Sequence, residues 1–264
     1  MEIKTNVALR KVQKLPFCYL CGRKLEKSDS ITRDHVPPKA IFLACDRIKP
    51  LILPAHYKCN QKESKTDEVV GQLIYALHGI YPEKGKRRVR VNIYEDMSNK
   101  TSVLALEGID LRGVIARCVK AFHAALYKEY LPRNTRNWFD PPTLPGIKKN
   151  GKIVFEETKV QFPLFVSTIK KNRKAGKLDR ISCFNDKCIY ECVWEQMDDG
   201  TWACIFALNI YDWKNLGDPL HQPRRGCVGF YVPKKGLPEN ATTGIMRNIE
   251  IPILNLDPLD PFGG

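Results

Sequence analysis

Four side chains of the kinds that bind zinc occur in this sequence as two pairs with the same spacing. The pairs are Cys18-x-x-Cys21 and His56-x-x-Cys59. Two intervening residues let both members of a pair bind one ion from a single turn, and three thiolates with one imidazole form a common tetrahedral zinc site. With ten cysteines in the chain, an isolated CxxC is weak evidence, and the alternative is buried apolar cysteines with His56 at the surface. The repeated spacing favours one structural Zn²⁺ bound by all four side chains.

The residues between and after these pairs have the chemistry of a hydrolytic site. Asp34 and His35 are adjacent, and Asn60 directly follows Cys59. A carboxylate and an amide oxygen are ligands for a hard divalent ion, and a histidine beside them can take a proton from water near neutral pH. Hydrolysis of a phosphodiester needs a base for the water and a cation for the charge on the phosphate. Taken alone, the Asp34–His35 pair would indicate only a turn with a capping aspartate.

Glu63 follows Asn60 by three residues, which places the two side chains on the same face of a helix. It is a candidate third ligand of the divalent ion, or a carboxylate that supports the ligands. A solvated helix carboxylate is the alternative.

Three segments of this region resemble one known family. The segments CYLCG, TRDHVPP and HYKCN resemble the zinc-stapled HNH, or ββα-metal, endonucleases, which include phage Holliday-junction resolvases and many small bacterial HNH proteins. The resemblance covers about residues 15–68. It implies that Asp34 and Asn60 bind a catalytic Mg²⁺ or Mn²⁺, that His35 is the general base, and that cleavage leaves 5′-phosphate and 3′-hydroxyl ends. It also implies that Leu51–Leu53 is the second strand of a hairpin and that Asn60 lies at the start of the following helix.

The sequence departs from the family pattern at two positions. No asparagine lies between His35 and Asn60, where many members have one that helps to orient the base. His56 stands where a cysteine is usual. Because a protonated imidazole cannot bind the ion, zinc affinity should depend more strongly on pH than in a four-cysteine site.

The segments that must position these residues indicate an α+β protein of two parts. Residues 1–68 show little apolar periodicity, and so small a unit generally needs a metal ion to be stable. We expect a treble-clef-like, zinc-stapled HNH module over residues 1–68. An α+β accessory domain of mixed helices and antiparallel strands, which positions substrate or a partner, is expected over residues 69–264.

Helices are predicted where apolar residues recur every three or four positions, and strands where they alternate. The predicted helices are Thr66–Tyr81, Asp110–Leu131 and Pro163–Lys174. The predicted strands are Arg87–Glu95, Lys152–Glu157, Cys188–Gln196, Thr201–Ile210 and Gly226–Val232. Asp198-Asp199-Gly200 is typical of a hairpin turn between the third and fourth of these strands. Asn134–Lys152 and the tail from Leu237 are rich in Pro, Asn and Gly and are predicted to be irregular.

Other potential ligands are interpreted as structural. Cys188 and Cys192 on one predicted strand and Cys204 on its partner lie among large aromatic residues, which favours buried thiols over a second zinc site. On the helix Asp110–Leu131, His123 is predicted at the edge of the apolar stripe. The basic residues of that helix are expected outside the stripe.

Composition restricts the partners of the chain. The 264 residues include 43 Lys and Arg against 29 Asp and Glu, a net charge of +14. Such a charge indicates a protein that binds a polyanion, more often nucleic acid than an anionic membrane surface. The alternative is a basic protein that has no polyanionic partner. No apolar run approaches the roughly 20 residues of a membrane-spanning helix, and the first segment lacks the apolar core of a signal peptide. We therefore expect a cytoplasmic protein without a membrane partner.

Together these features predict a divalent-metal-dependent endonuclease that acts on DNA in preference to RNA. Two other functions stay open. One is a non-catalytic zinc module that binds nucleic acid. The other is a protein-interaction factor whose basic charge serves solubility.

Overall fold

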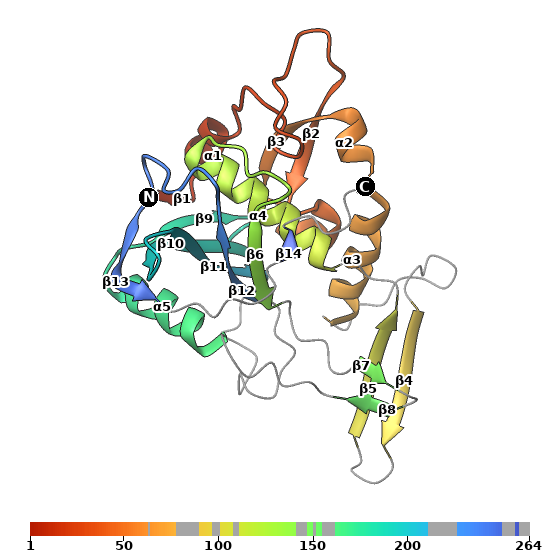
Figure 1. The fold of residues 1–264 in the computed structure, drawn as a ribbon. Coiled ribbons are helices and arrows are strands. Elements are labelled where there is room, and N and C mark those ends of the chain that lie inside the picture. Colours follow the sequence, from red (N-terminus) through yellow and green to blue (C-terminus); the bar gives the residue numbers. More distant parts are fainter. Residues whose placement is uncertain are drawn as a thin grey trace.

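The chain is an α+β protein in which a large sheet is covered by helices and the N-terminal segment lies at one end (Figure 1). The structure is a computed structural model that describes residues 1–62, 64–77, 90–96, 101–107, 111–140, 147–149, 152–154, 162–210, 226–249 and 257–258. These ranges contain five α-helices, the large sheet and three separate two-stranded hairpins. The predicted α+β class is confirmed.

The large sheet is built from eight strands drawn from both ends of the chain. Its order is β1-β9-β10-β11-β12-β6-β14, and β13 pairs with the second half of β10. The β1–β9 and β10–β13 pairs are parallel, whereas the other pairs are antiparallel. The strands are β1 (Glu2–Ile3), β6 (Arg136–Asp140), β9 (Asp179–Cys183), β10 (Cys188–Met197), β11 (Trp202–Ile210), β12 (Gly226–Val232), β13 (Thr243–Ile249) and β14 (Asp257–Pro258).

Both faces of this sheet are buried. One face packs against α4 (Leu111–Tyr127) and the N-terminal segment, and the other packs against α5 (Phe162–Lys174). Because residues alternate along a strand, Trp194 of β10 lies on the α4 face and its neighbour Val193 on the α5 face. The predicted burial of three thiols is confirmed, and all three lie on the α4 face of the sheet: Cys188, Cys192 and Cys204.

The N-terminal segment is a β-hairpin flanked by short helices. β2 and β3 pair antiparallel, and α2 follows β3 directly. The elements are α1 (Asn6–Val12), β2 (Ile31–Val36), two 3₁₀ turns (Lys39–Ile41 and Ala44–Asp46), β3 (Leu51–His56) and α2 (Tyr57–Gln61). The predicted strand Leu51–Leu53 lies within β3. Asn60 was expected at the start of the following helix, but it is the fourth of the five residues of α2.

This segment shares its core with the rest of the chain. Tyr19, Leu53 on β3 and Phe122 on α4 belong to one buried cluster. Helix α3 (Ser64–Leu77) continues through residue 68, where the boundary between the two parts is predicted. The division into two domains stays a prediction.

The predicted regular elements are present where the structure describes them, and residues 78–81, 87–89, 110 and 155–157, at the ends of four of them, lie outside the described residues. Helices α3, α4 and α5 correspond to the three predicted helices, the predicted hairpin is β10–β11, and β12 has its predicted bounds. Two further hairpins are formed by β4 (Arg90–Asp96) with β5 (Thr101–Glu107), and by β7 (Ile147–Lys149) with β8 (Lys152–Val154).

Two segments predicted to be irregular contain strands, and that prediction is wrong for them. β6 and β7 lie within Asn134–Lys152, and β13 lies in the tail after Leu237. β6 pairs with β12, and β13 pairs with β10. Both strands therefore depend on pairing with a strand that is distant in the sequence. Propensity for a strand depends on such context more than on the strand's own composition.

Helix α4 is buried on more sides than its apolar stripe predicts. Arg117, Lys120 and His123 are at most 4% exposed. The sheet, α3 and the N-terminal segment all pack around this helix. The expectation of a histidine at the helix edge is therefore wrong, and His123 lies in the core.

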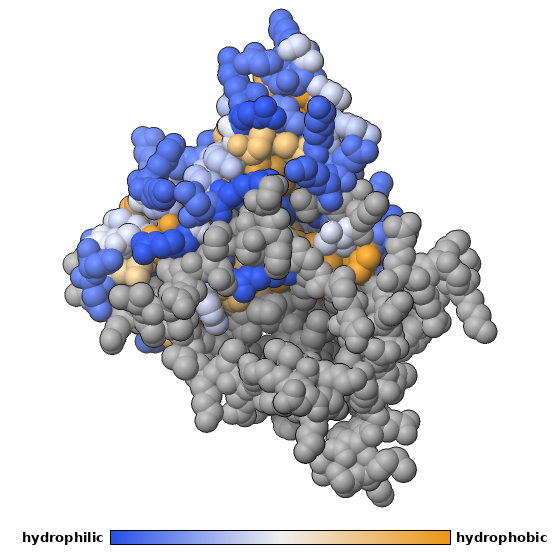
Figure 2. Space-filling model, turned by 45° about the vertical axis from the view of Figure 1, so that its right-hand side comes forward, coloured by the Kyte–Doolittle hydropathy of each residue, from blue (hydrophilic) through white to orange (hydrophobic). Residues whose placement is uncertain are grey.

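The face drawn in Figure 2 shows a mostly hydrophilic surface over the N-terminal segment, with a smaller apolar area between the polar groups. Among the described residues, no helix combines the length and the apolar character needed to cross a membrane.

Candidate metal centre and adjoining residues

The side chains of Cys18, Cys21, His56 and Cys59 converge on one point. Their ligand atoms all lie within 4.8 Å of one another. A tetrahedral zinc ion, about 2.3 Å from sulfur and about 2.0 Å from nitrogen, places its ligand atoms roughly 3.5–3.8 Å apart. The distance from Cys21 Sγ to His56 Nδ1 is 3.3 Å. These four residues could therefore bind a metal ion, as the paired spacing predicts.

The backbone holds the first cysteine pair in a tight turn. The Cys18 amide donates to the Arg23 carbonyl at 2.9 Å, and the Gly22 amide donates to the Cys18 carbonyl at 2.8 Å. Gly22 has a φ of +76°, a conformation that residues with a Cβ adopt at a cost. A Cβ at this position would also overlap the ring of Tyr130. The glycine after Cys21 is thus required by the turn that presents the thiols.

Three contacts orient His56, the last residue of β3. Its amide donates to Cys18 Sγ at 3.4 Å, its Nδ1 faces Cys21, and its Nε2 lies 3.3 Å from Oδ2 of Asp29. An Nε2–H donated to a carboxylate leaves Nδ1 free to bind a cation, which is the usual arrangement around metal-bound histidines. Asp29 was not identified from the sequence, because no regular spacing connects it with His56, 27 residues away.

The three thiols affect one another's ionisation. Burial raises the pKa of Cys18, and burial with the charges of the other two thiols raises the pKa of Cys59 to about 12. Burial acts in the same direction on Cys21, but hydrogen bonds from Arg23 and His56 outweigh it and lower the pKa of Cys21 to about 6. One thiol of the cluster can therefore ionise readily at neutral pH. A divalent cation would compensate the charge of all three.

Asp34 lies on the buried face of the β2–β3 hairpin and is 6% exposed. Its Oδ2 accepts a hydrogen bond from the hydroxyl of Tyr19, which lies between the two cysteines of the turn. Burial raises the pKa of the Asp34 carboxyl, and the positive charge of Arg117 on α4 opposes this effect. Arg117 also pairs with Asp67 on α3. This network links the cysteine turn to two helices, and neither Tyr19 nor Arg117 was identified from the sequence.

His35 lies on the opposite face of the hairpin from Asp34, because neighbouring side chains alternate along a strand. It is partly buried, and its cross-strand partner is Ile52. Burial, and then the positive charge of Lys39, lower the pKa of His35. The imidazole is therefore neutral at pH 7, the state in which it can accept a proton.

Asn60 is partly buried in α2 and directly follows Cys59. Helix α2 packs on both strands of the hairpin. Glu63 lies outside the described residues. Of the predicted site residues, the structure gathers the four sulfur and nitrogen ligands, and it connects Asp34 to them through Tyr19.

The N-terminal segment thus combines a cluster of soft ligands, a buried carboxylate, a nearby amide and a neutral imidazole on the other face of the hairpin. A soft cluster suits zinc, and oxygen ligands suit magnesium or manganese.

Comparison of the chain with protein-family models, with curated proteins and with solved structures finds no match.

Proposed function

We propose that this chain is a metal-dependent endonuclease that hydrolyses phosphodiester bonds of nucleic acid, DNA in preference to RNA. One observation carries the proposal: two side chains with oxygen donors adjoin the same cluster of three thiols and an imidazole. Asp34 accepts a hydrogen bond from Tyr19 within the cysteine turn, and Asn60 follows Cys59. The candidate base His35 is the next residue after Asp34 on β2.

The donor atoms suit two kinds of ion. Three thiols and an imidazole suit a structural Zn²⁺, which would hold the turn against the end of the hairpin. The carboxylate of Asp34 and the amide of Asn60 suit Mg²⁺ or Mn²⁺, with Glu63 proposed as a further ligand. Such an ion would stabilise the negative charge on the phosphate and on the leaving oxygen. The proposal therefore requires that Asp34, which faces the core, and His35, on the other face of β2, act on the same phosphate.

In this proposal each side chain has a separate task. His35 takes the proton from the attacking water, and burial keeps its imidazole neutral for that step. Tyr19 fixes the orientation of Asp34, while Arg117 lowers the cost of burying that carboxylate. The net charge of +14 supports a polyanionic substrate.

The burial of Asp34 favours a second candidate, a zinc module that binds nucleic acid without cleaving it. A carboxylate that is 6% exposed and hydrogen-bonded to Tyr19 is satisfied without a metal ion. This function keeps the zinc cluster and the basic charge but needs no second ion. The protein-interaction alternative has no comparable observation in its favour.

A plasmid-nicking assay separates the two candidates. An endonuclease should convert supercoiled DNA to nicked and linear forms with Mg²⁺ or Mn²⁺ and should stop when these ions are omitted. His35→Ala should lower the rate by about 10²–10⁴-fold, the usual contribution of a general base. Asn60→Ala should also lose activity and recover part of it at higher Mn²⁺, because one ligand of several is removed. Zinc content and unfolding temperature should stay at parental values in both variants.

Two results would contradict the proposal. If His35→Ala cleaves as fast as the parent protein, the mechanism is wrong. If the parent binds DNA but cleaves no DNA or RNA with any divalent ion, the non-catalytic module is the function.

The zinc assignment has its own test. Cys59→Ala should lower the zinc content of the purified protein, whereas Cys45→Ala removes an exposed thiol outside the cluster and should not. Metal analysis that finds no zinc in the parent would refute the assignment.

A further inference from the structure

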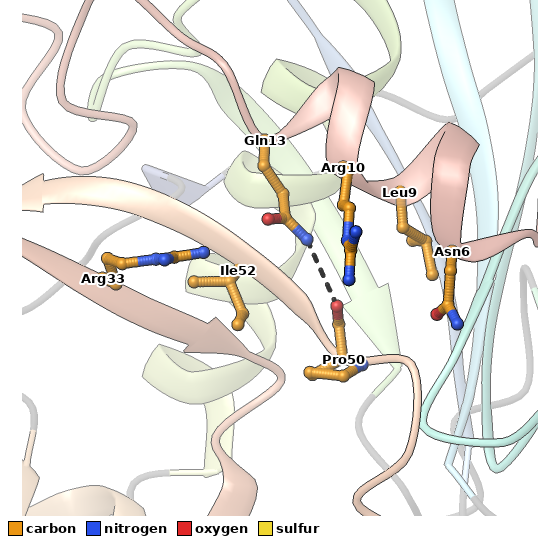
Figure 3. A pocket seen from close by; sticks show the side chains of 7 residues that line it. All are labelled: Asn6, Leu9, Arg10, Gln13, Arg33, Pro50 and Ile52. Atoms are coloured by element: carbon orange, nitrogen blue, oxygen red, sulfur yellow. Dashed lines mark hydrogen bonds between the residues drawn. The ribbon is translucent and has the colours of Figure 1, made fainter.

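A groove lies between α1 and the face of the β2–β3 hairpin that carries His35. Its volume is about 420 Å³. Figure 3 shows side chains from α1 directed toward the hairpin, with residues of the hairpin opposite them. The lining residues are Asn6, Leu9, Arg10 and Gln13 from α1 and its end, and Arg33, Pro50 and Ile52 from the hairpin and the residue before β3.

The described residues that line the groove carry positive charge and no carboxylate. Arg10 and Arg33 come from opposite walls, and both are exposed. Neither forms an ion pair within the described part of the chain, and the lining residues described there include no Asp or Glu. A guanidinium group presents several N–H donors in a planar fork that matches a phosphate.

A hydrogen bond joins the two walls of the groove. The Gln13 side-chain amide donates to the Pro50 carbonyl at 3.4 Å (Figure 3). This contact holds the end of α1 against the start of β3, so that Arg10 is positioned relative to the hairpin. Two cationic side chains on walls held in this way form a place for one anionic group.

The groove adjoins the candidate base. Arg33 and His35 are two residues apart on one face of β2, a distance of about 6.6 Å along a strand. Ile52, the cross-strand partner of His35, lines the groove. A nucleic-acid strand with one phosphate at His35 would therefore bring a neighbouring phosphate to Arg33 and Arg10.

We infer that this groove binds a phosphate of the nucleic-acid backbone adjacent to the scissile one, with Arg10 and Arg33 as its ligands. The inference rests on the proposed function for the position of the scissile phosphate. Binding in the groove can nevertheless be measured without cleavage.

The test is the affinity for a fluorescently labelled DNA duplex, measured by anisotropy at several salt concentrations without Mg²⁺ or Mn²⁺. Each phosphate contact contributes about −0.9 to the slope of log affinity against log salt. Arg10→Gln and Arg33→Gln should each weaken binding and make the slope shallower, by about 1 in total when both are changed, because the two side chains contact one phosphate. Lys11→Gln removes the same charge from the next residue of α1, outside the groove, and should keep the parental slope.

The outcomes distinguish the groove from the nuclease. If Arg10→Gln and Arg33→Gln keep the parental slope, the groove inference is wrong even where the parent cleaves DNA. If both make it shallower while the parent never cleaves, the groove binds phosphate and the nuclease proposal fails. If the parent shows no binding at low salt, both are overturned.

Cleavage kinetics add a readout where the parent is active. Arg10→Gln should raise KM with little change in kcat, because it removes binding to a phosphate that does not react. A fall in kcat with unchanged KM would contradict a flanking-phosphate role.

Discussion

Replacing His123 with glutamine should weaken the dependence of protein stability on pH. His123 is 1% exposed, its Nδ1 lies 2.9 Å from the Tyr231 hydroxyl, and its ring meets that of Tyr127 edge-on. Burial, and then the positive charge of Lys235, lower the pKa of His123 from 6.5 to about 3. The folded protein therefore keeps this imidazole neutral in mild acid, whereas the unfolded chain protonates it.

The size of the effect follows from these two pKa values. The unfolded state takes up the proton below pH 6.5 and the folded state only near pH 3, so stability from this group is complete above pH 6.5 and is lost as the pH falls. One pH unit in this interval corresponds to about 1.36 kcal/mol. Between pH 7 and pH 5 the free energy of unfolding should fall by about 2 kcal/mol on account of His123 alone.

Urea unfolding of the parent and of His123→Gln at pH 7 and pH 5 measures this difference. Glutamine can still hydrogen-bond to the Tyr231 hydroxyl but does not titrate, so the variant should lose about 2 kcal/mol less than the parent between the two pH values. Other titrating groups are common to both proteins and cancel in the comparison. Equal losses would refute the reasoning. If the variant does not fold, NMR of the labelled imidazole in the parent decides, because the His123 signal should stay that of a neutral ring down to about pH 4.

Three further changes have expected outcomes. Asp29→Ala should weaken zinc binding by about 10- to 100-fold in competition with a chelator, because it removes the acceptor that orients the imidazole of His56, a candidate zinc ligand. Glu26→Ala removes the same charge from the same loop and should leave zinc binding unchanged. Gly22→Ala should lower both the unfolding temperature and the zinc affinity, since its positive φ and the adjacent aromatic ring leave no place for a Cβ; an unchanged unfolding temperature would contradict this. Burial raises the pKa of the Glu195 carboxyl, so the stability it provides is lost as the pH rises. Glu195→Gln should therefore be at least as stable as the parent in urea at pH 8. A clearly less stable variant would contradict the raised pKa of this carboxyl.

Sequence patterns predicted the structure where a few neighbouring residues determine it. The β10–β11 hairpin forms around Asp198-Asp199-Gly200, and its alternating residues cover both faces of the sheet, as expected. The cluster of three cysteines and His56 could be predicted equally well from the sequence, because the spacing of two residues between ligands is a local constraint that occurs in both pairs.

The parts that could not be predicted depend on contacts between distant segments. Arg117 was expected outside an apolar stripe, but it pairs with Asp67, 50 residues earlier, and is buried. Asp29 has no spacing that connects it with His56. The strand β6 forms because β12 lies beside it, although the sequence of β6 predicts an irregular segment. In each case the environment comes from tertiary packing, which overrides local propensity.

The pairing of the hairpin has a consequence for what the metal ion does. A shift of β2 by one residue relative to β3 would turn His35 toward the core and Asp34 toward solvent, because a one-residue slip exchanges the two faces of a strand. Both strands contact the same cysteine turn: β3 through His56, and β2 through the hydrogen bond that Tyr19 donates to Asp34. An ion bound in the cluster would therefore help to fix the register of the two strands. Its removal should weaken this constraint on the alignment of β2 with β3, although the buried Val36, Leu51 and Leu53 still favour the observed pairing.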